Sequence, residues 1–192
     1  MPRVGVLALQ GDVREHTSML ERVGADVVAV RTAEQLDDLD GLVMPGGEST
    51  TIAYLLTTSG LRPALATRID DGLSVFGTCA GLILLAHEIL DGRSDQWSFD
   101  ALPLSVRRNG YGRQIASFET NVDVKGLGDV PGVFIRAPKI ETWSEDLEVL
   151  AFHDHGDGDH PVLVRRGSLW GCSFHPELTA DDRVHRLYVD SL

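Results

Sequence analysis

Residues 73–90 read LSVFGTCAG followed by LILLAHEIL, with Cys79 inside a Gly-x-Cys-x-Gly bracket. A short apolar run, a glycine-bracketed turn and an apolar helical run predict a strand, a sharp elbow and a helix. This is the setting of a G-x-S-x-G nucleophile elbow, here with sulfur in place of oxygen. Gly77 and Gly81 would allow the turn and the close approach of helix and strand. The positive end of a helix favours a thiolate. We therefore interpret Cys79 as an activated thiol, and not as a buried structural cysteine.

The first ninety residues alternate between strand and helix patterns. We expect strands at 4–9, 26–30, 41–44 and 73–78, and helices at 12–23, 51–58, 61–70 and 82–90, with a short acidic helix or turn at 32–40. Asp12 is the expected N-cap of the first helix. Continuous apolar runs are typical of strands buried on both faces of a parallel sheet. The fold class predicted is α/β, with three layers and a mostly parallel central sheet flanked by helices.

The pattern changes after Asp91, where glycine- and proline-bearing turns separate short strands. Strands are expected at 104–108, 114–120, 132–136, 147–152, 161–166 and 169–174, the last three as an antiparallel meander. A final helix is expected from Thr179, its candidate N-cap, and Cys172 is expected to serve packing in its strand. The predicted fold thus has an antiparallel extension in its C-terminal half, and we expect residues 1–192 to form a single domain.

Composition and charge exclude several classes of function. The chain carries 29 acidic and 17 basic residues, a net charge of −12, which disfavours binding to nucleic acid. No apolar run approaches the length of a membrane span, and the N-terminus lacks the layout of a signal peptide. Its two cysteines do not suggest a disulfide framework. These features predict a cytoplasmic protein that does not associate with a membrane.

Two more segments could act together with Cys79. The loop 45–50, PGGEST, follows an expected strand, and its backbone N–H groups could hold an oxyanion; an ordinary tight turn with a helix cap explains it equally well. Later, His175-Pro176-Glu177 follows a strand, and alternate residues of an extended segment point the same way. Glu177 could then orient His175 as the base that Cys79 requires. The alternative, a solvated turn, leaves Cys79 without a base.

The other histidines receive structural interpretations. His16, His87 and His185 fall on expected helices and are assigned to helix surfaces or core edges. The stretch 153–160, HDHGDGDH, fits an exposed hairpin loop and lacks the ligand spacing of a structural zinc site. We expect neither a metal nor a cofactor.

Taken together, PGG at 45–47, GTCAG at 77–81 and HPE at 175–177 resemble the triad (class I) glutamine amidotransferases. Within that family the chain is similar to the glutaminase subunits of pyridoxal 5′-phosphate synthases. That similarity covers almost the whole chain, although the loop 153–160 looks longer than usual. The matching segments are 6–11, 46–51, 108–109 with 112–114, 134–138 and 171–179.

The resemblance implies a role for each motif residue. Cys79 would attack the side-chain amide of L-glutamine, and backbone N–H groups of Gly47 and Ala80 would hold the oxyanion. His175 would protonate the departing ammonia and then activate water, with Glu177 orienting its ring. The residues implied to bind glutamine are Gly47, Glu48, Ser49, Arg108, Ile135 and Arg136.

The resemblance also implies a partner. Ammonia would pass to a separate synthase subunit that makes pyridoxal 5′-phosphate, within a large hetero-oligomer. Such glutaminases are typically switched on by the partner. We therefore expect the Gly46–Gly47 peptide to reorient when the synthase docks near Gln10–Gly11 and the helix that follows.

Three other interpretations remain open at this stage. The same reaction could serve another ammonia-using synthase, such as that of histidine biosynthesis, although the matches at 47–51 and 134–138 argue against it. A cysteine peptidase or redox sensor could use a similar elbow, but would not explain His175-Pro176-Glu177. A metal-binding or scaffold protein could use the loop 153–160.

Overall fold

The computed structural model describes residues 1–108, 110, 117–154 and 156–192. Four features of the sequence analysis lie outside the described residues: Asn109, the segment 112–114, the start of the strand expected at 114–120, and His155. None of the helices formed by the described residues combines the length and hydropathy needed to cross a bilayer.

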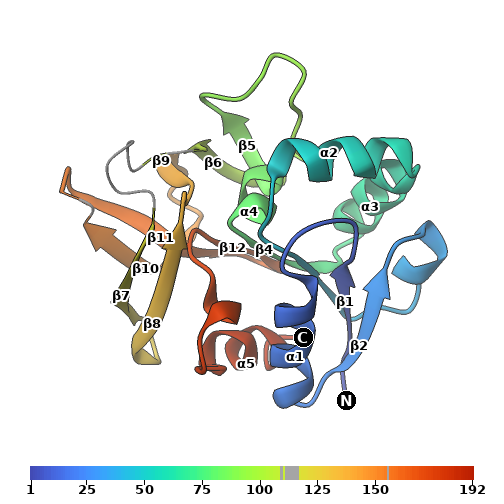
Figure 1. Cartoon of the computed structure of the whole chain (residues 1–192), viewed down its shortest axis with the longest axis horizontal. Coiled ribbons are helices and arrows are strands. Elements are labelled where there is room, and N and C mark those ends of the chain that lie inside the picture. The colour runs from blue at the N-terminus through green and yellow to red at the C-terminus, as the bar shows by residue number, and fades with distance from the viewer. Residues whose placement is uncertain (109, 111–116, 155) are drawn as a thin grey trace.

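A seven-stranded sheet forms the centre of the molecule and takes strands from both ends of the chain (Figure 1). The strand order is β10-β11-β12-β4-β3-β1-β2, parallel from β12 to β2 and antiparallel from β10 to β12. The predicted α/β class, with a mostly parallel sheet and an antiparallel extension, is confirmed. The strand bounds are β1 Arg3–Leu7, β2 Asp26–Val30, β3 Gly41–Met44, β4 Ser74–Thr78, β10 Glu148–Asp154, β11 Asp159–Arg166 and β12 Leu169–Cys172.

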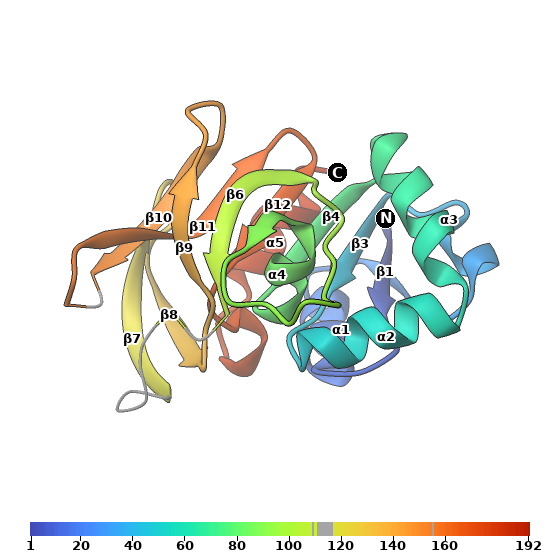
Figure 2. The same cartoon turned by 90° about the horizontal axis from the view of Figure 1, so that it is seen from above.

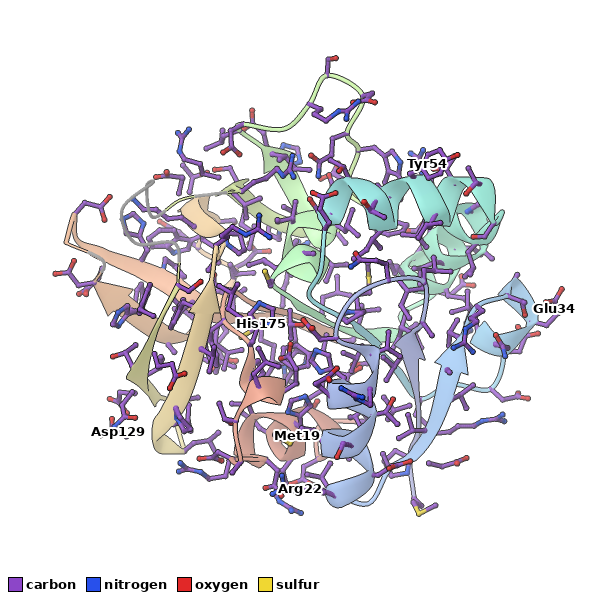
Figure 3. All side chains as sticks on the ribbon, in the orientation of Figure 1. Met19, Arg22, Glu34, Tyr54, Asp129 and His175 are labelled. Atoms are coloured by element: carbon purple, nitrogen blue, oxygen red, sulfur yellow. The ribbon has the colours of Figure 1, made fainter. Side chains whose placement is uncertain are left out.

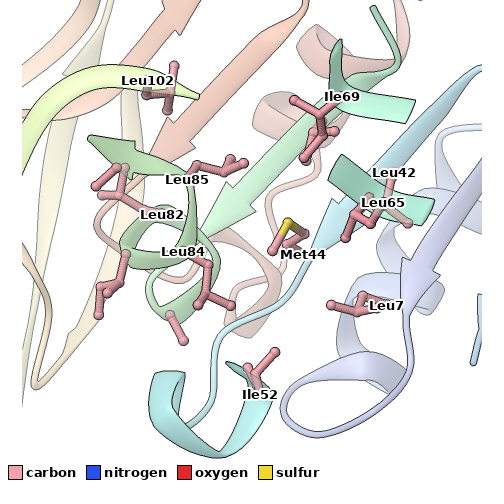
Figure 4. Close-up of a cluster of buried hydrophobic side chains, with 14 of the residues drawn as sticks. Leu7, Leu42, Met44, Ile52, Leu65, Ile69, Leu82, Leu84, Leu85 and Leu102 are labelled. Atoms are coloured by element: carbon pink, nitrogen blue, oxygen red, sulfur yellow. The ribbon is translucent and has the colours of Figure 1, made fainter. Parts of the chain in front are cut away.

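Helices cover both faces of this sheet, with α2 and α3 on one side and α1 and α5 on the other (Figure 1). Successive side chains of a strand point to opposite faces, so one strand supplies both cores. In β3, Leu42 and Met44 pack in the cluster under α2, α3 and α4 (Figure 4), whereas Val43 packs in the cluster under α1 and α5. The helix bounds are α1 Val13–Arg22, α2 Ser49–Thr58, α3 Leu61–Asp70, α4 Ala80–Leu85 and α5 Arg183–Val189.

Two smaller sheets extend the C-terminal half. β5 (Ala86–Ile89), β6 (Leu102–Arg107) and β9 (Lys139–Trp143) form one; β7 (Ser117–Val124) and β8 (Gly128–Ile135) form the other. Figure 2 shows β7 and β8 at the end of the molecule opposite α3. Short 3₁₀ helices at Ala33–Leu36 and Pro176–Leu178 complete the structure.

The structure corrects two sequence predictions in the middle of the chain and adds one strand that was not expected. The helix expected at 82–90 ends at Leu85, because Ala86–Ile89 pair with β6 as strand β5, which also places His87 on a strand. Strand β9 (Lys139–Trp143) was not expected. A short apolar run does not distinguish helix from strand. Pairing with a distant segment therefore decides which of the two it forms.

The last helix starts at Arg183, and Thr179 is not its N-cap. The Thr179 hydroxyl instead donates to the carbonyl of Pro176 at 3.1 Å and accepts from the N–H of Asp181 at 3.2 Å. These bonds stabilise a turn in the four residues between the 3₁₀ helix and α5, so the chain enters α5 one turn later than predicted.

Tyr188 joins α5 to two central strands, and the contribution of its hydroxyl group to stability can be tested. Its hydroxyl donates to the carbonyl of Ser74 at 3.0 Å and accepts from the N–H of Leu42 at 3.1 Å, and the side chain is 0% exposed. Tyr188→Phe would remove both hydrogen bonds from the core and lower the free energy of unfolding by about 1–3 kcal/mol, because each bond contributes about 0.5–1.5 kcal/mol; urea denaturation measures the change.

The matched control is Tyr54→Phe, because Tyr54 points outward from α2 and is 67% exposed (Figure 3). It should change stability by less than about 0.5 kcal/mol. Equal effects of the two substitutions would contradict the role assigned to the Tyr188 hydroxyl.

Candidate active site

The candidate site lies where four parallel strands end at the same edge of the sheet. β12, β4, β3 and β1 are neighbours, and the chain leaving them carries His175, Cys79, Gly47 and Asp12 respectively. Ligand crevices of open α/β sheets form at this edge. Here it holds a cleft of about 360 Å³. The cleft is lined by Gln10, Asp12, Gly47, Glu48, Ser49, Cys79, Ile83, Arg108, Ile135, Arg136, His175 and Leu178.

The elbow places its unusual backbone conformation on Cys79 itself, which has φ 47° and ψ −101°. Such a conformation costs a non-glycine residue roughly 1–3 kcal/mol and persists only where neighbours hold it. The Cys79 N–H donates to the carbonyl of Cys172 at 2.8 Å, which fixes the elbow to β12.

The bracketing glycines serve close approach. A Cβ on Gly77 would lie 2.6 Å from the carbonyl carbon of Gly81, and one on Gly81 would lie 2.1 Å from the carbonyl oxygen of Met44. Neither glycine has a positive φ, so neither is required for the turn itself. Their lack of a side chain instead allows helix α4 to pack closely on β3 and β4.

His175 and Glu177 form a buried pair, and Figure 3 shows His175 near the middle of the molecule. The ring Nδ1 lies 2.7 Å from Oε1 of Glu177 and 3.4 Å from Oδ2 of Asp12. His175 is extended (φ −106°, ψ 88°), but Pro176 starts a 3₁₀ helix, so the expected extended segment ends there. The two side chains meet across this turn and not along a strand.

The surroundings of His175 favour its charged form. Burial alone would lower the pKa of the ring, but hydrogen bonds with Asp12, Cys79 and Glu177 outweigh it and raise the pKa to about 12. The ring therefore keeps both protons at neutral pH, and a neighbouring imidazolium is typical of reactive cysteines. Burial raises the pKa of Glu177, an effect that its hydrogen bond with His175 opposes.

The loop 45–50 contacts several neighbours at once. Glu48 is the N-cap of α2: one carboxylate oxygen accepts the N–H of Thr51 at 2.8 Å, and the other lies 2.7 Å from Nη2 of Arg108. The helix cap expected in this loop is present at Glu48, and the same residue holds the cationic side chain of Arg108 at the cleft.

A second set of contacts holds the loop to the segment after β1. The Gly46 carbonyl accepts the N–H of Asp12 at 3.1 Å, and the N–H of Glu48 donates to Oε1 of Gln10 at 2.8 Å. A Cβ on Gly46 would lie 2.4 Å from Cε1 of His175, so only glycine fits between the loop and the ring.

All six residues expected to bind glutamine line the cleft together with Cys79 and His175, while Ala80 and Glu177 are buried beside it. Sequence reasoning missed Gln10, Asp12, Ile83 and Leu178 as lining residues. Position after β1, at the same edge of the sheet, is the signal that could have found Gln10 and Asp12.

Asp12, His16 and His185 require correction. Asp12 stands at the N-cap position of α1, but its side chain makes no capping hydrogen bond and faces His175 instead. His16 and His185 are not on helix surfaces or core edges: both are 0% exposed. His16 Nε2 lies 2.9 Å from Oγ1 of Thr78 and 3.4 Å from Oε1 of Glu177. Its spacing of four residues from Asp12, on the same helix face, is the signal that could have found it.

The histidine-rich stretch 153–160 closes the β10–β11 hairpin, and its exposed tip is as predicted. Asp154 accepts the N–H groups of Gly156 and Gly158 at 2.7 and 3.0 Å, which is turn chemistry. Within the part of the chain that the structure describes, the one group of three potential metal ligands is Asp12, His175 and Glu177, at the cleft and not in this hairpin.

The two free cysteines should differ in reactivity. Cys79 lines the cleft beside a protonated His175, whereas Cys172 is 0% exposed and burial raises the pKa of its thiol. Iodoacetamide at neutral pH should alkylate Cys79 at least about tenfold faster than Cys172, because a tenfold difference needs only one pKa unit. Peptide mass spectrometry of the native chain over time measures both rates.

Cys79→Ala is the control and should abolish rapid labelling, whereas Cys172→Ala should leave it unchanged. Preferential labelling of Cys172 would contradict the environment described for the two thiols.

Comparisons with known proteins agree over the whole chain. The SNO glutamine amidotransferase family matches residues 6–192. Pyridoxal 5′-phosphate synthase subunit PdxT of Frankia alni is 53% identical over 191 residues, covering 98% of this chain and 94% of that protein. The protein of the same name from Mycobacteroides abscessus is 52% identical, covering 98% and 96%. A crystal structure titled glutamine amidotransferase superposes with a TM-score of 0.91 at 49% identity, covering 98% and 97%. The chain therefore belongs to the SNO glutamine amidotransferase family.

Proposed function

We propose that this chain is the glutaminase subunit of a pyridoxal 5′-phosphate synthase and hydrolyses L-glutamine at Cys79. The observation that carries the proposal is a single cleft in which a strained, cleft-lining cysteine meets a protonated histidine backed by a buried carboxylate. Strands from both halves of the chain build the edge that holds this cleft, so we propose that residues 1–192 act as one domain.

The proposed reaction has two halves. The Cys79 thiolate adds to the side-chain amide carbon of glutamine, and N–H groups of Gly47 and Ala80 bind the oxyanion. His175 gives its proton to the leaving nitrogen, so ammonia departs and a glutamyl thioester remains. The neutral His175 then takes a proton from water, whose oxygen attacks the thioester; collapse of this second adduct releases glutamate and restores the thiolate and the imidazolium. One oxyanion donor typically contributes about 2.7–4 kcal/mol of transition-state stabilisation.

Glutamine binding is assigned to the six cleft residues that the family resemblance implies. Arg108 is held at 2.7 Å by Glu48, so the cleft carries a fixed cation and an anion side by side. That pair suits the carboxylate and ammonium groups of an α-amino acid. Hydrogen bonds from Thr50 and Thr51 outweigh the effect of burial and lower the pKa of Glu48, which keeps it ionised for this role. Arg136 and Ile135, both exposed, also line the cleft.

Ammonia is proposed to pass to the synthase subunit that makes pyridoxal 5′-phosphate, because the relatives over half identical are named subunits of that synthase. A large hetero-oligomer and a cytoplasmic location follow from this assignment, and a reducing cytoplasm suits a reaction that requires free Cys79. Glutamine hydrolysis for another synthase, such as that of histidine biosynthesis, is the alternative.

Partner control is proposed to act through the loop 45–50. The side-chain oxygen of Gln10 accepts the N–H of Glu48, and the N–H of Asp12 donates to the carbonyl of Gly46, so a synthase docked at this segment and α1 would act directly on the Gly46–Gly47 peptide. Gly47 has φ +152°, which leaves that peptide unusually free to reorient.

The decisive measurement is ammonia release from glutamine with and without the synthase subunit. Turnover should rise on adding the synthase, and Cys79→Ala should lower it at least about 1000-fold, the scale expected for loss of a nucleophile. Full turnover by the isolated chain would refute the switching idea but not the reaction. Absence of glutamine hydrolysis in the complex would refute the function itself.

Arg108 supplies a more specific test. Arg108→Met should raise KM for glutamine about tenfold or more with a smaller effect on kcat, because a charge-assisted contact of about 1.5–3 kcal/mol is lost from the bound substrate. Arg107→Met is the matched control: Arg107 pairs at 3.0 Å with Glu141, away from the cleft lining, and should leave KM unchanged. An unchanged KM in Arg108→Met would remove Arg108 from the binding site.

A further inference from the structure

Two buried histidines lie behind the proposed triad, and the reaction does not use either of them. His16, on α1, and His185, on α5, face each other with Nδ1 of His16 2.9 Å from Nε2 of His185. The other ring nitrogen of His16 lies 2.9 Å from Oγ1 of Thr78 and 3.4 Å from Oε1 of Glu177. His16 therefore contacts both the residue before Cys79 and the carboxylate that orients His175.

Both histidines are neutral. Burial is the main cause that holds the pKa of His16 well below its usual value, and the positive charge of His175 acts in the same direction. Burial also lowers the pKa of His185 to about 4. Each ring then carries one proton, and the position of that proton decides whether His16 presents a donor or a lone pair to Glu177.

The contacts distinguish the two possible arrangements. If His16 carried its proton on Nδ1, it would donate to Nε2 of His185, and His185 would carry its own proton on Nδ1. That Nδ1 is buried and has no hydrogen-bond partner among the described residues, so the arrangement would bury an unpaired N–H. It would also aim the lone pair of His16 Nε2 at the Glu177 carboxylate.

The opposite arrangement satisfies these groups. His185 donates from Nε2 to Nδ1 of His16, and His16 presents an Nε2–H to Oγ1 of Thr78 and to the Glu177 carboxylate. The only unpaired atom of the two rings is then a lone pair on His185, which is less costly than an unpaired donor. His185 thus determines the tautomer of His16.

We propose that His16 is a positioning residue of the triad: its Nε2–H, held in that tautomer by His185, fixes the Glu177 carboxylate relative to Thr78 and thereby to Cys79. This inference rests on the proposed function only in taking His175 and Glu177 as the partners of Cys79. It joins four separate segments of the chain, α1, β4, the 3₁₀ helix Pro176–Leu178 and α5, at one buried point.

The consequence is electrostatic. Glu177 Oε2 has no partner among the described residues, so the contacts of this carboxylate fall on Oε1, which lies 2.7 Å from Nδ1 of His175 and 3.4 Å from Nε2 of His16. Burial raises the pKa of Glu177, and the hydrogen bond with His175 at Oε1 opposes that effect. Without the His16 N–H, burial would favour the neutral form of Glu177. The positive charge of His175 would then lose the carboxylate that stabilises it. The remaining charged or titratable groups that act on these residues are Asp12 before α1, Arg22 on α1, Cys79, Cys172 on β12 and Asp182 before α5.

The test follows the alkylation rate of Cys79 by iodoacetamide from pH 5.5 to 9, which needs neither glutamine nor a partner. His16→Phe should lower the alkylation rate at pH 6 about tenfold, and its rate should approach that of the unsubstituted chain at pH 9. His16→Gln, whose amide N–H can replace Nε2–H, should restore most of the rate at pH 6. His185→Phe should lower the alkylation rate at pH 6 by a smaller factor, and His185→Gln should restore that rate.

A purely structural role is separated by a matched variant. Met19→Ala alters the same helix at a position 3% exposed, and Met19 lies away from His175 (Figure 3). It should lower stability without shifting the pH profile. If His16→Phe also changed only stability, the proposal would be overturned.

A second measurement reads the tautomers directly. Long-range ¹H–¹⁵N spectra of the imidazole rings should show Nε2–H, with no Nδ1–H, for both His16 and His185 between pH 6 and 8. An Nδ1–H tautomer for either ring would also overturn the proposal. Because neither readout depends on glutamine, failure of the glutaminase assay would leave the positioning role intact, and failure here would leave the glutaminase intact.

Discussion

Parallel pairing of β12 with β4 is the interaction on which the candidate site depends. Its register sets Cys172 opposite Thr78, and the Cys79 N–H continues the ladder by donating to the Cys172 carbonyl at 2.8 Å. This pairing brings a cysteine and a histidine that are far apart in the sequence to the same edge of the sheet. β3 and β1 extend the edge, so the loops after four adjacent strands converge on one cleft.

Close backbone packing at this edge explains its glycines and its strain. Gly77, Gly81 and Gly46 each stand where a Cβ would meet backbone or the His175 ring within 2.6 Å. Cys79 takes a positive φ between a strand tied into the sheet and a buried helix, which together can hold a conformation costing roughly 1–3 kcal/mol. The sheet and the α4 core therefore keep the thiol aimed into the cleft.

Charged side chains gather at and behind the cleft, and each of them requires partners of opposite charge or hydrogen-bonding groups. His175 lies within hydrogen-bonding or ion-pairing distance of both Glu177 and Asp12, and two neutral histidines continue the network to α5. A buried carboxylate is costly unless it is paired and hydrogen-bonded. The proposed roles of His175 and His16 both follow from that requirement, since a ring nitrogen of each faces the same oxygen of Glu177, at 2.7 and 3.4 Å.

Local sequence signals determined the α/β class, the strands at 26–30 and 41–44, the helix at 61–70 and the residues around Cys79, because apolar periodicity and glycine sterics act within a few residues. Only the tertiary structure decided that Ala86–Ile89 pair as a strand, that Lys139–Trp143 form another, that Asp12 faces His175 and that His16 and His185 are buried. These outcomes depend on which distant segment packs against each residue. A helical pattern records that a histidine shares a face with its neighbours, but the partner across that face comes from a part of the chain up to 169 positions away.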